Sequence, residues 1–166
     1  MKKKLVIGIM LILSGCAQTP LNKQTNSGYA EGVFEGAQLD DIKNRFVFAC
    51  NQKGYEIKEA SSNKVVCSKT LEGMNAVFTQ ALIGNQYSTT PEELLVFQLA
   101  RMDNNVQVSV RNYRETQMAF GQMSRVEIKN NKTTNLMQQS MDRIVGEYNA
   151  KREKPLTLQS APPPMQ

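Results

Sequence analysis

The chain has 166 residues, with 20 lysines and arginines against 15 aspartates and glutamates, and it contains no histidine. This length fits one domain, at roughly 100 to 200 residues per domain. Without histidine the chain cannot form a Ser-His-Asp or Cys-His nucleophile system, an HExxH zinc site or a Cys2His2 finger. A net charge of +5 is typical of proteins that bind nucleic acid, so the position of the charges has to be considered first.

The first sixteen residues have the order of an export signal. Three lysines at positions 2–4 precede an apolar run over residues 5–13. That run has the length of a signal-peptide core and is too short to span a bilayer. It is followed by the small residues Ser14 and Gly15 and then by Cys16. This arrangement resembles the lipobox of bacterial lipoproteins.

The resemblance implies that residues 1–15 are removed and that Cys16 carries the lipid, a diacylglyceryl group and usually a fatty acid such as palmitate. Two or more acyl chains give stable membrane attachment. Residue 17 is alanine, whereas an aspartate there commonly retains Gram-negative lipoproteins in the inner membrane. The resemblance therefore implies the outer membrane, with the body expected in the periplasm; a surface-facing body and an ordinary secretory signal are the alternatives.

Cleavage changes the charge of the chain. It removes three lysines and no acidic residue, which leaves 17 basic and 15 acidic side chains and a net charge of +2. The remaining chain contains no short run rich in lysine and arginine. We therefore expect no nucleic-acid partner.

The composition divides the chain into four parts. Residues 16–36 are polar and glycine-rich, which predicts a lipidated flexible tether. Residues 37–149 contain the periodic segments and are expected to form a single domain. Residues 150–166 end in Ala-Pro-Pro-Pro-Met-Gln, which predicts a disordered proline-rich tail.

Apolar periodicity predicts a helix over residues 38–53, closed by Gly54. A hairpin follows, with strands at 55–59 and 64–69. Residues 71–83 have helical spacing but are ambiguous. Residues 93–102 read as a strand that turns at 103–105.

The second half of the domain begins with a clean alternation. Val106, Val108 and Val110 alternate with polar residues, which is typical of a strand with one buried face. A further strand, bent near Gly121, is predicted over residues 118–128, and a helix with an asparagine cap over 133–148.

This order predicts an α+β fold: an antiparallel curved sheet of about five strands with two or three helices packed on one face. The layout is similar to the helix-grip arrangement of some envelope-assembly lipoproteins. That likeness concerns element order only and implies no function.

Cys50 and Cys67 are predicted to form a disulfide. Export places them in an oxidising compartment, and the strand that carries Cys67 is expected to pack beneath the helix that carries Cys50. Two buried free thiols are the alternative. No metal site is predicted, because histidine and a further free cysteine are lacking.

Four arginines, Arg101, Arg111, Arg114 and Arg125, lie on or between the predicted strands. Neighbouring strands can gather guanidinium groups into a patch for an anion or a partner. The alternative is a solvated sheet face balanced by Glu115 and Glu127.

No set of catalytic residues or cofactor motif is present. The acidic pairs 40–41 and 92–93 are adjacent in sequence, whereas glycoside hydrolysis needs two carboxylates across a substrate. The sequence also lacks GxSxG, P-loop and GxGxxG motifs. We therefore predict a non-catalytic lipoprotein without cofactor, anchored to the membrane, that serves as a binding or scaffold subunit of an envelope machine for secretion, conjugation or outer-membrane assembly. An exclusion or immunity lipoprotein and an envelope glycan or lipid hydrolase are the alternatives.

Overall fold

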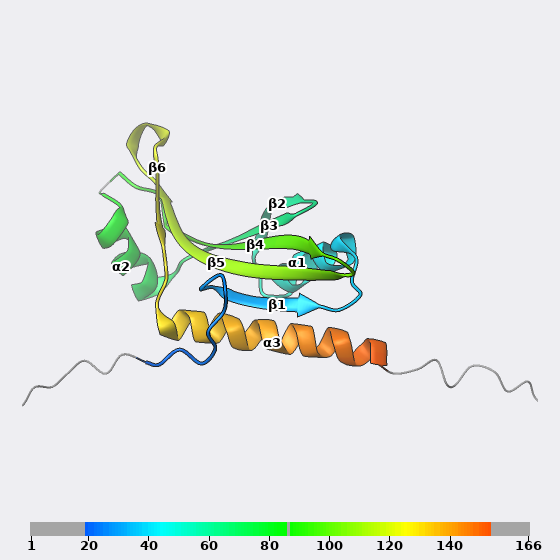
Figure 1. Cartoon of the computed structure of the whole chain (residues 1–166). Coiled ribbons are helices and arrows are strands. Elements are labelled where there is room, and N and C mark those ends of the chain that lie inside the picture. Colours follow the sequence, from blue (N-terminus) through cyan, green and yellow to red (C-terminus); the bar gives the residue numbers. More distant parts are fainter. Residues whose placement is uncertain (1–18, 86, 154–166) are drawn as a thin grey trace, which may run out of the picture.

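The computed structural model describes residues 19–85 and 87–153, which form one α+β fold (Figure 1). Cys16 and most of the predicted tail lie outside these residues. The described elements are β1 (Ala30–Phe34), α1 (Leu39–Gln52), β2 (Glu56–Ser61), β3 (Lys64–Thr70), α2 (Gly73–Ile83), β4 (Glu92–Met102), β5 (Asn105–Gln117), the 3-10 turn η1 (Ala119–Gly121), β6 (Met123–Glu127) and α3 (Asn131–Glu153).

All strands belong to one antiparallel sheet in the order β1-β5-β4-β3-β2, and the sheet is not closed into a barrel. The long strand β5 has two partners on the same side. β1 pairs with its residues 106–110 and β6 with its residues 113–117. The predicted fold class is therefore confirmed, with one more strand than expected.

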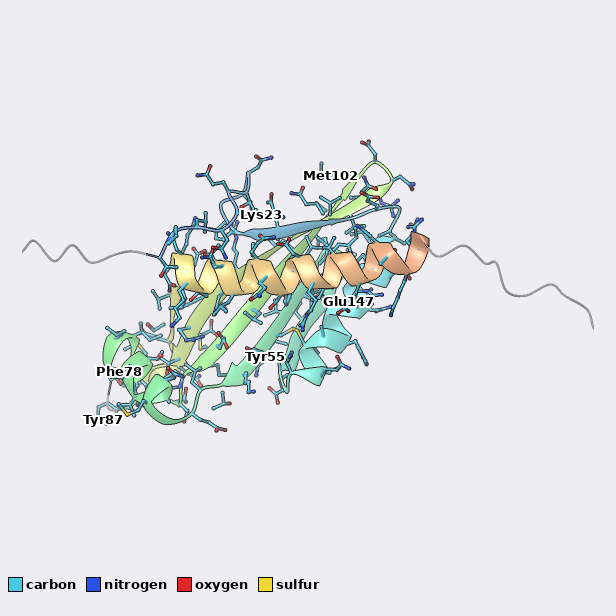
Figure 2. The ribbon with its side chains drawn as sticks, turned by 90° about the horizontal axis from the view of Figure 1, so that it is seen from below. Lys23, Tyr55, Phe78, Tyr87, Met102 and Glu147 are labelled. Atoms are coloured by element: carbon cyan, nitrogen blue, oxygen red, sulfur yellow. A yellow bond between two sulfur atoms is a disulfide. The ribbon has the colours of Figure 1, made fainter. Side chains whose placement is uncertain are left out.

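Helices α1 and α3 cover the same face of the sheet. Alternation along β5 turns Val106, Val108 and Val110 toward them, and all three valines are buried. From the helices, Phe46 and Met141 join this core. Figure 2 shows α3 and α1 lying across the strands on this face, with α2 at one end of the molecule.

The disulfide links α1 to β3. Cys50 and Cys67 form a disulfide in the structure, with their Cα atoms 6.3 Å apart, and both are buried. In the chain-entropy model, a loop of this size is worth about 3 kcal/mol. Directly after the disulfide-bearing helix, Gly54 adopts a φ of 71° and closes the helix as predicted.

Contacts between β1 and α3 hold the N-terminal segment on the body. Gln138 of α3 is buried and bonds the outer edge of β1 twice: its Oε1 accepts from the Glu31 N–H at 2.9 Å, and its Nε2 donates to the Glu31 carbonyl at 2.8 Å. Gly32 leaves room for the helix, since a Cβ there would lie 2.6 Å from Cγ2 of Val145. The exposed edge of the sheet is thus covered by a helix.

The structure differs from the predicted boundaries in three places. Residues 30–34 were assigned to the tether but form β1. Their partners on β5 lie more than 70 positions away in sequence, so local periodicity did not predict this strand. The predicted strand over 118–128 is interrupted by η1, where Phe120 has a φ of 62°. Helix α3 extends from Asn131 to Glu153, beyond both predicted ends.

Gly32 and Gly146 give a matched pair of tests for the packing of α3 on β1. Gly32→Ala is expected to lower the free energy of unfolding by about 1–3 kcal/mol, because the added methyl group forces α3 away from the sheet. Gly146→Ala adds a methyl group that meets nothing within 4 Å. It should raise stability by up to about 1 kcal/mol, because alanine favours a helix over glycine.

Chemical denaturation of both variants measures the two effects. Equal stability of Gly32→Ala and the wild-type protein would contradict the close approach of α3 to β1.

Candidate functional site

The side of the sheet opposite α1 and α3, called here the open face, carries two adjoining hollows. One has a volume of about 920 Å³ and lies over β3, β4, β5 and β6; the other has about 560 Å³ and reaches β1. Glu59, Lys64 and Gln98 line both hollows. The floor of the larger one includes Val66 and Leu94. Strand alternation explains this surface, since residues next to the core valines point the opposite way.

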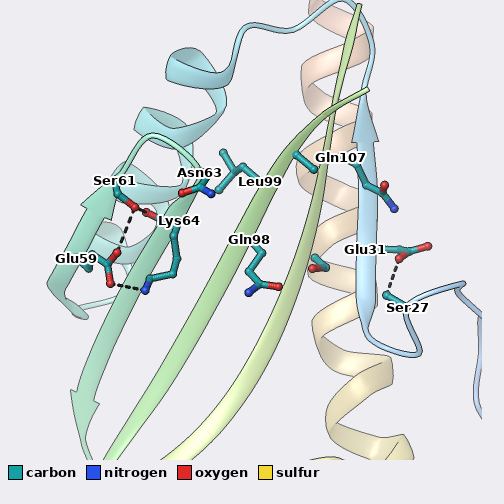
Figure 3. Close-up of a pocket in the computed structure, with 11 residues that line it drawn as sticks. Ser27, Glu31, Glu59, Ser61, Asn63, Lys64, Gln98, Leu99 and Gln107 are labelled. Atoms are coloured by element: carbon teal, nitrogen blue, oxygen red, sulfur yellow. Dashed lines mark hydrogen bonds and ion pairs between the residues drawn. The ribbon is translucent and has the colours of Figure 1, made fainter. Parts of the chain in front are cut away.

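Several ion pairs lie along the margins of the two hollows. Lys64 Nζ lies 2.7 Å from Glu59 Oε2 (Figure 3), and Arg125 pairs with Glu115. Lys58 lies 2.9 Å from Glu56 and 3.6 Å from Glu92. The register of β2 against β3 shifts between Ile57 and Glu59, next to these charged residues. The open face therefore has a few largely buried apolar side chains at its floor and paired charges at its margins.

Tyrosine rings and cations stack at the side of the open face near β1 and β6. Arg111 lies 4.5 Å and Lys129 4.3 Å from the centre of the Tyr29 ring. Arg125 lies 5.5 Å from the centre of the Tyr113 ring. A hydrogen bond with Glu127, helped by desolvation, raises the pKa of Tyr29 above its usual value. The cations there are thus already held by aromatic faces.

The four predicted arginines do not form one patch. Arg111 and Arg125 lie on the open face, each beside a tyrosine. Arg114 points to the helix side and bonds Glu93. Arg101 lies near the start of α1 and donates to Gln38 Oε1 at 3.1 Å. The four guanidinium groups do not all gather in one place, because adjacent strand positions alternate between faces and Arg101 lies at the other end of β4.

Arg114 and Glu93 belong to a largely buried network of polar side chains. Glu93 accepts from Arg114 Nη1 and Tyr55 Oη, each at 2.7 Å, and from Asn112 Nδ2 at 2.9 Å. The side chains of Arg114 and Glu93 are only about one fifth exposed. Desolvation raises the pKa of Glu93, but the three hydrogen bonds outweigh it and hold that pKa below its usual value. Desolvation of Tyr55 and its hydrogen bond to Glu93 raise the pKa of Tyr55.

Three of the carboxylates that line the hollows are ion-pair partners, and the fourth, Glu31, accepts from the Ser27 hydroxyl. Glu59, Glu92 and Glu115 each have a cation within reach, and the hydrogen bond from Lys64 lowers the pKa of Glu59. A general acid needs the opposite shift. Glu92 and Glu93 lie on opposite faces of β4, as their different partners show.

Within residues 19–85 and 87–153, no group of three or more cysteine, aspartate and glutamate side chains is placed to hold a metal ion. In the same part of the chain, no helix has the length and apolar character needed to cross a membrane. Met137 and Met141, which the sequence places on one helix stripe, pack on the core.

Comparison of the sequence with known protein families and with curated protein sequences gives no match. The assignment of function therefore depends on the residues and their geometry.

Several residues of the open face were not singled out from the sequence. Glu59, Lys64 and Gln98 belong to three neighbouring strands. The register between the strands brings them together, and the periodicity of a single strand does not predict that register. Tyr29 belonged to the predicted tether. The position of Gln98 on the open face could have been predicted in part. It follows Phe97, which faces the core, and side chains alternate along β4.

Glu93→Gln tests the network beneath the sheet. At neutral pH the change is expected to lower the free energy of unfolding by about 1–3 kcal/mol, because Arg114 loses its charged partner while about four fifths buried. The folded pKa of Glu93 is depressed, so its contribution is present above the unfolded value of about 4.3 and is lost as the pH falls through the folded value.

The difference in stability between the wild-type protein and Glu93→Gln should therefore shrink on acidification. Denaturation at a series of pH values measures it, with Glu147→Gln on the exposed side of α3 as the control. A difference that stays constant down to the acid end of the series would contradict the role of the Glu93 charge.

Proposed function

We propose that this chain is a lipid-anchored protein of the bacterial envelope, attached to the outer membrane through Cys16. It acts by binding, as a subunit of an envelope machine such as a secretion, conjugation or outer-membrane assembly complex. The open face is the surface that receives the partner protein. The observation that carries this proposal is the uneven cover of the sheet, with α1 and α3 on one face and hollows on the other.

The chemistry of the open face supports a protein partner. Protein interfaces combine a desolvated apolar centre with a polar rim. On the open face, Val66, Leu94 and Val96 line the larger hollow, and ion pairs such as Lys64–Glu59 stand at its margin. These pairs are exposed to solvent and contribute little to stability, so they are available for choosing a partner by charge.

The anchor is supported by sequence alone, through the order of charge, apolar core, small residues and Cys16. A binding role is supported by the ion-paired state of Glu59, Glu92 and Glu115, since the pairing lowers the pKa of Glu59, whereas a general acid needs a raised pKa. An enzyme that acts on glycan or lipid is the weaker proposal on these grounds.

Cys16→Ser tests the anchor. The substitution removes the thiol that would take the diacylglyceryl group, so the protein should leave the membrane fraction and lose labelling by radioactive fatty acid. Ser14→Ala keeps a small residue before the cysteine and should leave both readouts unchanged. Unaltered fractionation and labelling of Cys16→Ser would contradict the anchor.

Gln98→Arg tests the open face. Gln98 is exposed and lines both hollows, so the substitution should leave the fold intact and bring an unpaired charge into the interface. Burying such a charge costs at least about 1–3 kcal/mol, and 1.4 kcal/mol corresponds to about tenfold in affinity. Gln139→Arg, the same change at an exposed position of α3, is the matched control.

The measurement is chemical cross-linking in living cells, followed by purification of the full-length protein from membranes. The cross-linked envelope partner should be lost with Gln98→Arg and retained with Gln139→Arg. Equal recovery with both variants, or a chain without any cross-linked partner, would contradict the proposed role of the open face.

A further inference from the structure

One end of the molecule exposes many apolar side chains. Helix α2 presents the side chain of Leu82 at 83% exposure, and the turn η1 presents the ring of Phe120 fully to solvent. Phe120 is held in the left-handed region, with a φ of 62°, which costs free energy for a bulky residue. Other exposed apolar residues at this end are Met74, Val77, Phe78, Tyr87 and Met123.

The two segments that carry these apolar residues lack charged side chains. Residues 73–91 and 116–124 contain no aspartate, glutamate, lysine or arginine. At the chain average of 21%, these 28 residues would carry about six charges. The two segments are 24 positions apart in sequence, and the fold brings them together, since α2 contacts β5 and β6. An apolar surface of this kind marks a site that meets a protein or a membrane.

The start of the described chain lies at this end too. The carbonyls of Thr19 and Pro20 accept hydrogen bonds from Asn131 and Asn135 at the beginning of α3, each at 2.8 Å. Figures 1 and 2 both place this segment, α2 and η1 at the same end of the molecule. Cys16 precedes Thr19 by three residues, which reach about 11 Å at most when fully extended.

We propose that α2 and η1 rest in the interface of the bilayer that holds the lipid of Cys16. This inference rests on the anchor in the proposed function. A lipid on Cys16 would bring Thr19 to within about 11 Å of the membrane, so the end of the body that carries Thr19 is the end that meets it. An interfacial helix buries its apolar side about 5–10 Å deep at the boundary of headgroups and acyl chains.

The chemistry of this end suits a lipid surface. Helix α2 satisfies most of its backbone groups internally, as a segment entering lipid must. Phe78, Tyr87 and Phe120 are aromatic residues of the kind that gather at membrane interfaces. Because residues 73–91 and 116–124 carry no charged side chain, their own contact with the bilayer depends on apolar burial.

The experiment places a photo-reactive benzophenone amino acid in the full-length chain at Phe78 and, in a separate chain, at Met102. Both side chains are exposed, at 61% and 50%, and Figure 2 shows them at opposite ends of the molecule. After irradiation of intact membranes, lipid adducts are expected at position 78 and should be absent at position 102. A second probe at Phe120 should behave like position 78.

Three results would overturn the proposal. A chain found in the membrane fraction without lipid adducts at positions 78 and 120 would refute the lipid contact and leave the anchor standing. Protein adducts at these positions in place of lipid would identify this end as a protein-docking surface. A chain found in the soluble fraction would refute the anchor and the lipid contact together.

Discussion

The close approach of α3 to β1 is the contact on which the rest of the structure depends. It requires Gly32, because a side chain there would occupy the space of Val145, and it is fixed by the two hydrogen bonds of Gln138 to Glu31. At the far end of the helix, Arg152 donates to the Glu35 carbonyl at 2.7 Å. The N-terminal segment thereby becomes part of the sheet and completes the core through Phe34, whose ring packs edge-on against Phe46 and Tyr148.

If Cys16 carries the proposed lipid, the bonds from the start of α3 to residues 19–22 also limit how the body can be oriented on the membrane. A flexible tether of some twenty residues would have let the domain move far from its anchor. Since residues 19–22 are bonded to the start of α3, the free length between Cys16 and the body shrinks to about three residues. An anchor so short restricts the orientation of the domain, so the end that carries α2 becomes relevant to function.

The sequence predicted the elements that have strong local periodicity and missed those that depend on distant partners. Helix α1, the β2–β3 hairpin and the alternation of β5 followed from spacing, and the pairing of Cys50 with Cys67 followed from the helix and hairpin. Strand β1 has five residues, one of them glycine, and its partner strand lies more than 70 positions away. Arg111 and Arg114 differ by three positions in one strand, so alternation alone separates them, whereas the approach of Arg125 to Tyr113 needs the register of β6.

The two proposed surfaces adjoin each other, because Met123 and the neighbouring segment 116–117 both line the larger hollow and belong to the apolar end. In Figure 1, α3 lies below the sheet, α2 lies at one end, and β6 with the turn beside it rises above the sheet at that same end. With that end against a bilayer, the open face would stand roughly upright from the membrane and remain accessible to a partner. The part-buried network around Glu93 joins β4 and β5 to Tyr55, which precedes β2, through charged hydrogen bonds in a poorly solvated place. A body on a short anchor presents its binding face at a fixed height and angle, which reduces the entropy lost when a partner in the same membrane binds.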